Sequence, residues 1–150
     1  KGGAGEIGYL PMGREPLNAE EKKHGALEYS LNQLRRKYLE AQDAQPLDGR
    51  IMELHARSSA YDDYIDAMAR DCATAVASIM TLLDPEIVIV GGPLGHDPKL
   101  HARLSTWLQA YAADVIVVRK SALGQDAGLL GAIAMALQAT QAQLFSSALA

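Results

Sequence analysis

Two carboxylates of this sequence stand among glycine and apolar residues. Glu6 lies in the phrase GEIG at residues 5–8, and Glu28 ends the phrase GALE at residues 25–28. A carboxylate beside apolar walls can accept hydrogen bonds from paired hydroxyl groups, which is one way in which proteins select sugars. Composition alone also allows both residues to be ordinary acids of a loop and of a helix end.

Two glycine-bearing turns are a second candidate for ligand binding. Residues 91–95 read GGPLG and follow a β-branched run, and residues 124–128 read GQDAG ahead of an apolar helix. Ligands of open α/β sheets bind at the carboxyl ends of strands, where backbone N–H groups can meet a phosphate or a nucleoside. The spacing matches neither G-x-G-x-x-G nor a P-loop. Packing that needs glycine dihedrals is the alternative explanation of both turns.

The sulfur and imidazole side chains do not form a recognisable reactive set. Cys72 is the single cysteine, so it cannot form a disulfide within the chain, and its place on an apolar stripe predicts a buried, inert thiol. The histidines lack metal-ligand spacing and are expected to be solvated at the surface. They are His24, His55, His96 and His101.

These residues need a scaffold, and its clearest element is a helix over about residues 60–83. Apolar residues recur there at steps of three and four and make one stripe. Ser59 is the expected N-cap, with Asp62 as the acidic residue three positions on, and Asp84-Pro85 ends the helix. The stripe consists of Tyr61, Ile65, Met68, Cys72, Val76, Ile79 and Leu83.

A strand, a helix and a second strand follow. The strands are predicted at 86–90 (EIVIV) and 114–118 (DVIVV), and both are expected to be covered on both faces because polar residues do not alternate in them. Asp97 and Pro98 supply the N-cap and the first position of the helix between them. Such a βαβ unit predicts parallel strands with a right-handed crossover. The predicted fold class is therefore α/β.

The two ends of the chain are predicted to be mostly helical. A last helix that starts near Asp126 is apolar nearly all round over residues 127–137, and we expect it to be buried. Another helix is expected after Gly25, and a shorter one after Asp48-Gly49. Residues 11–24 are expected to be loop or a polar helical turn, and residues 6–12 a short strand.

Length and composition favour one ordinary globular domain. The 150 residues are 49% hydrophobic and carry a formal net charge of −4. Apart from a short run at residues 35–37 (RRK) the cations are scattered, which argues against a nucleic-acid surface. The apolar runs are too short to cross a bilayer, so a cytoplasmic protein is expected. Because Lys1 opens a glycine-rich phrase, we expect the sequence to be part of a longer protein.

Four phrases resemble, in order and spacing, the signatures of the ROK family (repressor, open reading frame, kinase). They are GEIGY at 5–9, GALE at 25–28, DPEIVIVGG at 84–92 and AGLLGA at 127–132. The resemblance implies that residues 1–150 are a single C-terminal lobe of an actin-like, ribonuclease-H-like ATPase fold. In that fold a sugar lies in the cleft between two lobes, and here the N-terminal lobe would lie outside the chain.

The resemblance also assigns roles to particular residues. Glu6 and Glu28 would contact sugar hydroxyls, and Gly91 and Gly92 would approach the nucleotide. Tyr9 stands where the family has a histidine that contacts sugar and ligates zinc, and its phenol can still form hydrogen bonds. The family's zinc cysteines are also missing, with Ala26 at the place of one, so no zinc is expected. An Asn18 cap and the packing of Leu17 would hold the loop instead.

The loss of the histidine and the cysteines favours a sugar-responsive transcriptional regulator, whose effector-binding and dimerisation lobe this chain would be. The alternative is the C-terminal lobe of an ATP-dependent hexose kinase, with ATP as cofactor, and a third is an interaction module that binds no ligand. The expected partners are a small sugar or sugar phosphate and a second copy, with DNA bound only through a domain outside the chain. The family's catalytic Asp would lie upstream, so this chain alone should not phosphorylate a sugar.

Overall fold

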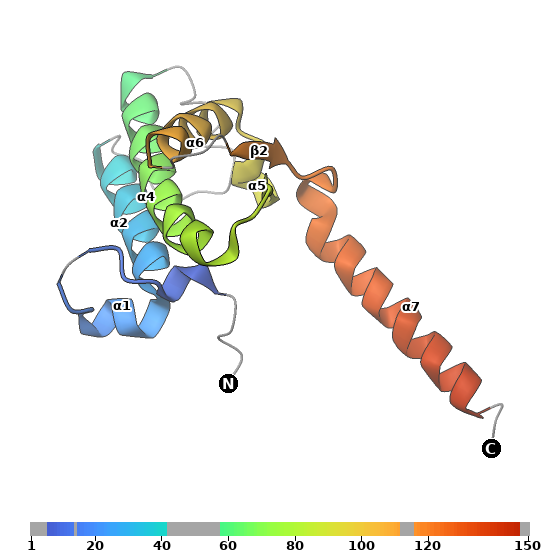
Figure 1. Cartoon of the computed structure of the whole chain (residues 1–150). Coiled ribbons are helices and arrows are strands. Elements are labelled where there is room, and N and C mark those ends of the chain that lie inside the picture. The colour runs from blue at the N-terminus through green and yellow to red at the C-terminus, as the bar shows by residue number, and fades with distance from the viewer. Residues whose placement is uncertain (1–5, 14, 42–57, 112–115, 148–150) are drawn as a thin grey trace.

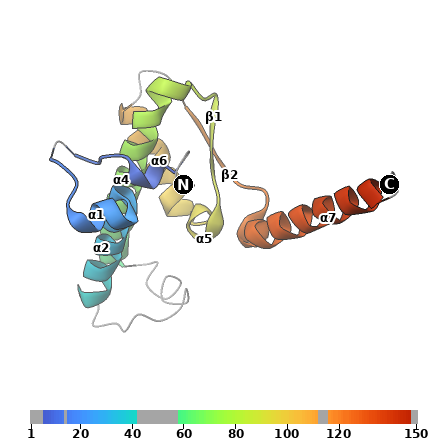
Figure 2. The ribbon, with the colours of Figure 1, turned by 90° about the horizontal axis from the view of Figure 1, so that it is seen from below.

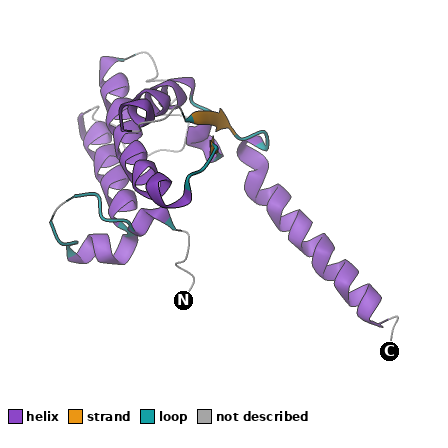
Figure 3. Cartoon of the chain, in the orientation of Figure 1, coloured by secondary structure: helices purple, strands orange, loops and turns teal. Residues whose placement is uncertain are grey.

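The computed structural model describes residues 6–13, 15–41, 58–111 and 116–147, and most of them are helical (Figure 3). Within these ranges two short strands form a sheet. The chain is therefore mixed α/β, with helix as the larger part. The elements in chain order are η1 (Ile7–Tyr9), α1 (Ala19–His24), α2 (Ala26–Ala41), α4 (Ser59–Leu83), β1 (Ile87–Val90), α5 (Gly92–Gly95), α6 (Pro98–Tyr111), β2 (Val117–Lys120), η2 (Gly124–Asp126) and α7 (Ala127–Ser147).

Helix α4 is the predicted amphipathic helix, with one correction at its start. The N-cap is Ser58 rather than Ser59, because Ser58 has the extended backbone of a cap and its hydroxyl accepts a hydrogen bond from the Tyr61 amide at 3.1 Å. The predicted end at Asp84 is confirmed. Asp84 takes a left-handed conformation (φ 44°) and its N–H donates to the Met80 carbonyl, which closes the last turn before Pro85.

The core lies where α4 packs between α2 and α6, and the three helices lie side by side (Figure 1). The first part of the predicted stripe is buried, whereas Leu83 at its end is exposed. Alanines among the large side chains let the helix backbones approach closely. The buried cluster consists of Tyr38, Tyr61, Ile65, Met68, Ala69, Ala73, Leu100, Leu104 and Leu108.

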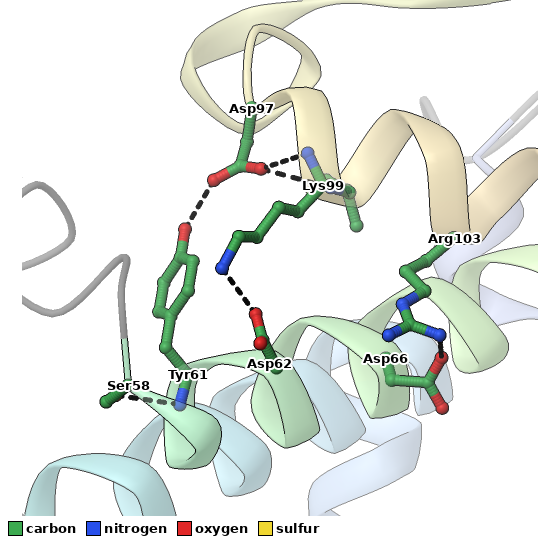
Figure 4. Close-up of polar contacts among 8 residues, drawn as sticks. Ser58, Tyr61, Asp62, Asp66, Asp97, Lys99 and Arg103 are labelled. Carbon is green, nitrogen blue, oxygen red and sulfur yellow. Dashed lines mark hydrogen bonds and ion pairs between the residues drawn. The ribbon is translucent and has the colours of Figure 1, made fainter.

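Polar contacts join α4 to α6 along one side (Figure 4). The predicted cap of α6 is confirmed, since Asp97 Oδ1 accepts from the amides of Lys99 at 2.7 Å and Leu100 at 3.0 Å. The other carboxylate oxygen of Asp97 accepts a hydrogen bond from the Tyr61 hydroxyl. Lys99 Nζ lies 2.5 Å from Asp62 Oδ1. One carboxylate therefore both starts α6 and ties it to α4.

The two strands are parallel, as predicted, and Ile87 pairs with Val117 in their register. Strand β2 runs from Val117 to Lys120 and not from 114 to 118, because pairing with β1 carries it beyond the apolar run. Residues 114 and 115 lie outside the described ranges. The prediction of cover on both faces is wrong. Val90 and Val118 pack on the helical core, but Ile89 on the opposite face is 63% exposed.

Helix α7 forms where the sequence predicts a last helix, but the prediction that it is buried is wrong. It extends away from the rest of the molecule (Figures 1 and 2), and among the described elements only η2 packs closely against it. Its leucines and isoleucine are exposed to solvent. None of the helices in the described ranges is long and apolar enough to cross a membrane.

The N-terminal segment is a turn and not the predicted strand. The Tyr9 amide donates to the Glu6 carbonyl at 3.3 Å and the Leu10 amide to the Ile7 carbonyl at 3.1 Å, which are the bonds of a 3₁₀ turn. The polar helical turn predicted before residue 24 is α1, and the helix predicted after Gly25 is α2. The short helix predicted after Asp48-Gly49 lies outside the described residues.

Candidate functional site

The turn η1, which carries Glu6 and Tyr9, is seated on the first turn of α2, which carries Glu28. Gly25 makes this seat possible. It has a φ of 89°, and a Cβ at this position would lie 2.6 Å from the carbonyl oxygen of Gly8. Only glycine allows both the conformation and the close approach. Two phrases that are separated by about twenty residues in the sequence are thereby placed together, as a shared sugar site would require.

The side chains of this candidate sugar site face solvent. Glu6 and Glu28 are exposed, and Tyr9 is 46% exposed, whereas Ala26 and Leu27 are buried beneath the turn. The apolar surroundings expected for the two carboxylates are therefore absent within the described residues. Their oxygen atoms are open to a ligand on one side of the helical core.

The loop that leads into α1 ends in the helix cap predicted at Asn18. The Asn18 side chain accepts a hydrogen bond from the Glu21 amide at 2.9 Å, and Glu21 Oε2 accepts from the Asn18 amide at 2.8 Å, so the predicted cap at Asn18 is confirmed as a reciprocal capping box. Across the described ranges, no three His, Cys, Asp or Glu side chains gather closely enough to hold a metal ion. The expectation that the protein binds no zinc stays a prediction.

Gly91 and Gly92 lie at the carboxyl end of β1, beside the turn that follows β2. The Ser121 amide donates to the Val90 carbonyl at 2.9 Å, and a Cβ at Gly91 would lie 3.6 Å from the Cβ of Ser121. The short helix α5 and η2 are in contact. The two glycine-bearing turns identified in the sequence therefore meet at one edge of the sheet, where ligands of α/β sheets bind.

The glycines of these turns serve different purposes. Gly92 has a φ of 75°, and a Cβ at this position would meet no atom within 4 Å, so the space beside its backbone is open. A Cβ at Gly95, by contrast, would lie 2.7 Å from the Val90 carbonyl oxygen. Gly124 also has a positive φ, of 63°. Packing and backbone conformation thus account for part of the motif. The backbone at Gly92 remains accessible to a ligand.

His96 lies between the two glycine-bearing turns, and sequence reasoning missed it. Its Nε2 would be 4.0 Å from a Cβ at Gly124, and the Nε2 atoms of His96 and His101 are shielded from solvent. Both side chains are half-buried, so the prediction of solvated surface histidines is wrong for them. It is right for His24, which is exposed beside Glu20. Nothing in the sequence around a lone histidine after a glycine-bearing turn indicates that it will lie beside a second such turn.

Cys72 is not a nucleophile in this structure. Burial, followed by the negative charge of Asp71, raises the pKa of its thiol to about 11. The thiol stays protonated at neutral pH, and the thiolate is the reactive form. Asp71 itself accepts a hydrogen bond from the Ser30 hydroxyl at 2.5 Å, which links α4 to α2. These residues contribute to packing.

The family model described as "ROK family" matches residues 1–139. The chain belongs to the ROK family. This confirms the resemblance carried by the four phrases. The ROK relatives include N-acetyl-D-glucosamine kinases from Pasteurella multocida (strain Pm70), 28% identical over 65% of this chain and 32% of that protein, and from Histophilus somni (strain 129Pt), 30% identical over 49% of this chain and 25% of that protein.

Solved ROK-like structures confirm the fold. A proposed N-acetylmannosamine kinase from Listeria monocytogenes superimposes with a TM-score of 0.67 at 23% identity, over 91% of this chain and 48% of that one. The ROK hexokinase from Thermus thermophilus gives a TM-score of 0.58 at 28% identity, over 87% and 47%. The chain therefore has the fold of part of an actin-like ATPase. It spans about a third of the length of the curated relatives it matches and about half of the solved ones.

Proposed function

We propose that this chain is the sugar-binding lobe of an ATP-dependent sugar kinase of the ROK family, with an N-acetylated hexosamine as the substrate class. The relatives that it matches at 28–30% identity are N-acetyl-D-glucosamine kinases. The two solved structures described above carry names of sugar kinases. The kinase alternative of the sequence analysis is thus better supported than the regulator.

The observation that carries this proposal is the pair of glycine-bearing turns at the carboxyl ends of β1 and β2. The backbone at Gly92 is open, and the second turn at Gly124 lies beside it. A protein that only senses sugar does not need a nucleotide-binding site at this edge of the sheet, whereas a kinase must bind ATP there. In this proposal Gly91 and Gly92 approach the nucleotide.

The sugar is held at the other candidate site. The exposed carboxylates of Glu6 and Glu28 accept hydrogen bonds from sugar hydroxyls, and the Tyr9 phenol can both donate and accept. Gly25 fixes the distance between the turn and the helix that carry them. The base that activates the attacking hydroxyl comes from the part of the polypeptide outside these 150 residues.

The test uses the full-length polypeptide and calorimetry with N-acetylglucosamine, N-acetylmannosamine and glucose, together with an assay of ADP release. Glu6→Gln should weaken binding of the preferred sugar by about 1–3 kcal/mol, because one charged acceptor is lost. Glu15→Gln, an exposed acid that is not part of the turn, is the matched control and should have no effect. Unchanged affinity in Glu6→Gln removes Glu6 from the site, and sugar binding without ADP release excludes the kinase.

One observation favours a second function, the sugar-responsive regulator. Tyr9 and Ala26 replace a histidine and a cysteine that the family's kinases have, and a regulator needs only to bind a sugar, not to orient it for attack. Such a protein would bind DNA through a domain outside this chain and act as a homodimer. It would bind sugar with the same Glu6 dependence but release no ADP, and its affinity for DNA would change when sugar is added.

A further inference from the structure

One buried hydroxyl group joins the start of α6 to the helical core. Tyr61, near the start of α4, is 1% exposed, and its hydroxyl donates a hydrogen bond to Asp97 Oδ2 (Figure 4). The other oxygen of Asp97 accepts from the amides of Lys99 and Leu100. Burial, followed by the hydrogen bond to Asp97, raises the pKa of the Tyr61 hydroxyl, which therefore stays a donor at neutral pH. Both oxygens of this carboxylate are thus held in fixed directions.

The segment between β1 and α6 is fixed at both of its ends. A Cβ at Gly95 would lie 2.7 Å from the Val90 carbonyl oxygen, so α5 folds back closely on the end of β1. Two residues after Gly95, Asp97 is bonded to α4. Between these two points lies His96, whose Nε2 would be 4.0 Å from a Cβ at Gly124 in the second turn. The position of Asp97 therefore sets the spacing between the two glycine-bearing turns.

The Tyr61 hydroxyl is not needed to pack α4 against α6. Further along the same two helices, Trp107 Nε1 donates to Asp66 Oδ1 at 3.1 Å, and Leu104 and Leu108 are buried. A phenylalanine would fill the space of the Tyr61 ring without the free-energy cost of burying a hydroxyl group. The hydroxyl therefore has a purpose other than filling the core, and its partner is the residue that ends the glycine-bearing segment.

We propose that Tyr61 is a positioning residue for the proposed nucleotide site and acts through Asp97. The hydrogen bond holds α5 in place, so that the backbone at Gly92 meets the nucleotide in one orientation. This inference rests on the proposed function, in which Gly91 and Gly92 approach the nucleotide. Tyr61 is too buried to touch the ligand itself. Because the turn is ordered in advance, nucleotide binding does not lose affinity to ordering it.

The candidate sugar site lies away from Tyr61 and serves as an internal reference. Near the start of α2, the Ser30 hydroxyl donates to Asp71 in the middle of α4. Near the end of α2, the ring of Tyr38 stacks on that of Tyr64, close to the start of α4. The turn η1 is seated on the first turn of α2, so it lies away from the start of α4. A loss of sugar affinity therefore reports general damage to the fold.

Calorimetry on the full-length polypeptide tests the inference, with ADP and with whichever of N-acetylglucosamine, N-acetylmannosamine and glucose the wild type binds best. Tyr61→Phe removes the hydroxyl and keeps the ring. Its affinity for ADP should fall about tenfold, because the turn must now be ordered when the nucleotide binds. Its sugar affinity should change by less than about twofold. Trp107→Phe, which breaks another hydrogen bond between α4 and α6, is the matched control and should retain both affinities.

The possible outcomes separate this inference from the proposed function. ADP affinity that is unchanged in Tyr61→Phe would overturn the inference and leave the proposed function intact. An equal loss of ADP affinity in Trp107→Phe, or a joint loss of ADP and sugar affinity, would also overturn it, since the hydroxyl would then only stabilise the fold. A wild-type protein that binds sugar but no ADP would overturn the proposed function, and this inference with it.

Hydrogen exchange tests the same contact without a nucleotide. In the unliganded full-length protein, Tyr61→Phe should speed exchange of the Lys99 and Leu100 amides about tenfold, because Asp97 then caps them less firmly. The same amides should exchange at the wild-type rate in Trp107→Phe. Wild-type rates in Tyr61→Phe would show that the hydroxyl does not hold this segment, and would contradict the proposal.

Discussion

The helical half of the molecule and its strand-and-α7 half treat their apolar residues in opposite ways. In the helical half, Ile65 and Leu108 are fully buried between helices, and polar contacts tie α4 to α6. In the other half, Ile89 and Leu129 have similar chemistry and are more than 60% exposed. The helical half is stabilised by contacts among its own residues. The second half leaves its large apolar residues exposed.

The candidate sites follow the same division. The turn that carries Glu6 and Tyr9 rests on α2 and α4, within the self-contained half. Gly91 and Gly92 lie where the two halves join, since α5, which begins at Gly92, contacts both α6 and η2. We therefore expect the proposed sugar site to keep its geometry when the strand-and-α7 half is perturbed, and the proposed nucleotide site at Gly91 and Gly92 to be more sensitive to such changes.

The largest expected effect tests the division directly, in the 150-residue chain. Ile65→Ala should cost about 2–5 kcal/mol of unfolding free energy, because it leaves a cavity in the core. Leu137→Ala should cost less than about 0.5 kcal/mol, since that side chain is already exposed. Denaturation with urea measures both. Similar losses in the two variants would mean that α7 packs on the body after all.

The next effect concerns the packing of the turn η1 against Gly25 at the start of α2. Gly25→Ala should cost about 2–3 kcal/mol and weaken sugar binding, because its methyl group would meet the Gly8 carbonyl and its φ of 89° disfavours alanine. Gly13→Ala is the matched control, since its Cβ would meet no atom within 4 Å. A stable Gly25→Ala variant with unchanged sugar affinity would show that this contact does not position the turn.

A pH titration examines the core of the helical half. Burial raises the pKa of the Cys72 thiol from 9.0 to about 11, so the unfolded chain loses this proton first as the pH rises. The stability from the protonated thiol is complete below pH 9 and is lost as the pH rises through 11, at up to about 1.4 kcal/mol per pH unit. Cys72→Ala should therefore show a shallower decline over this range. Identical slopes would place Cys72 in a more solvated position.

The smallest expected effects come from ion pairs. Lys99→Ala removes the 2.5 Å contact with Asp62, whose side chain is about half-exposed, and should cost about 0.5–1 kcal/mol. Arg36→Ala breaks a pair with Glu40 in which both side chains are about two-thirds exposed, and should cost less than about 0.3 kcal/mol. Melting curves of the two variants at low salt and at about 1 M salt compare these losses of stability. A larger loss at Arg36 would reverse the expected order.

Local signals made much of the fold predictable. The three- and four-residue spacing of α4, the Asp97 cap of α6 and the parallel pairing of the strands could all be inferred from neighbouring residues. Strand β2 could not be bounded, because its last residues, Arg119 and Lys120, are extended only through pairing with β1. The apolar sequence of α7 is typical of a buried helix. A helix is buried, however, only where another surface covers it.

The candidate site was only partly predictable for a related reason. Glu6 and Glu28 stood out as carboxylates among glycine and apolar residues, but Tyr9 was named only through a family phrase. The contact between Gly8 and Gly25, which brings the turn and the helix together, is tertiary and leaves no mark in local spacing. The 3₁₀ turn was mistaken for a strand, since Ile7 and Tyr9 alternate with glycine as strand residues would. The position of His96 results from the contact between two turns that are about thirty residues apart in the sequence.

Native-state hydrogen exchange on the 150-residue chain tests the division between the two halves most directly. We predict that amides in the middle of α4 and α6 exchange only through global unfolding, whereas amides over residues 129–137 of α7 exchange many orders of magnitude faster, as in an isolated helix. Protection of α7 equal to that of α4, in a chain that is monomeric in the same buffer, would contradict the account.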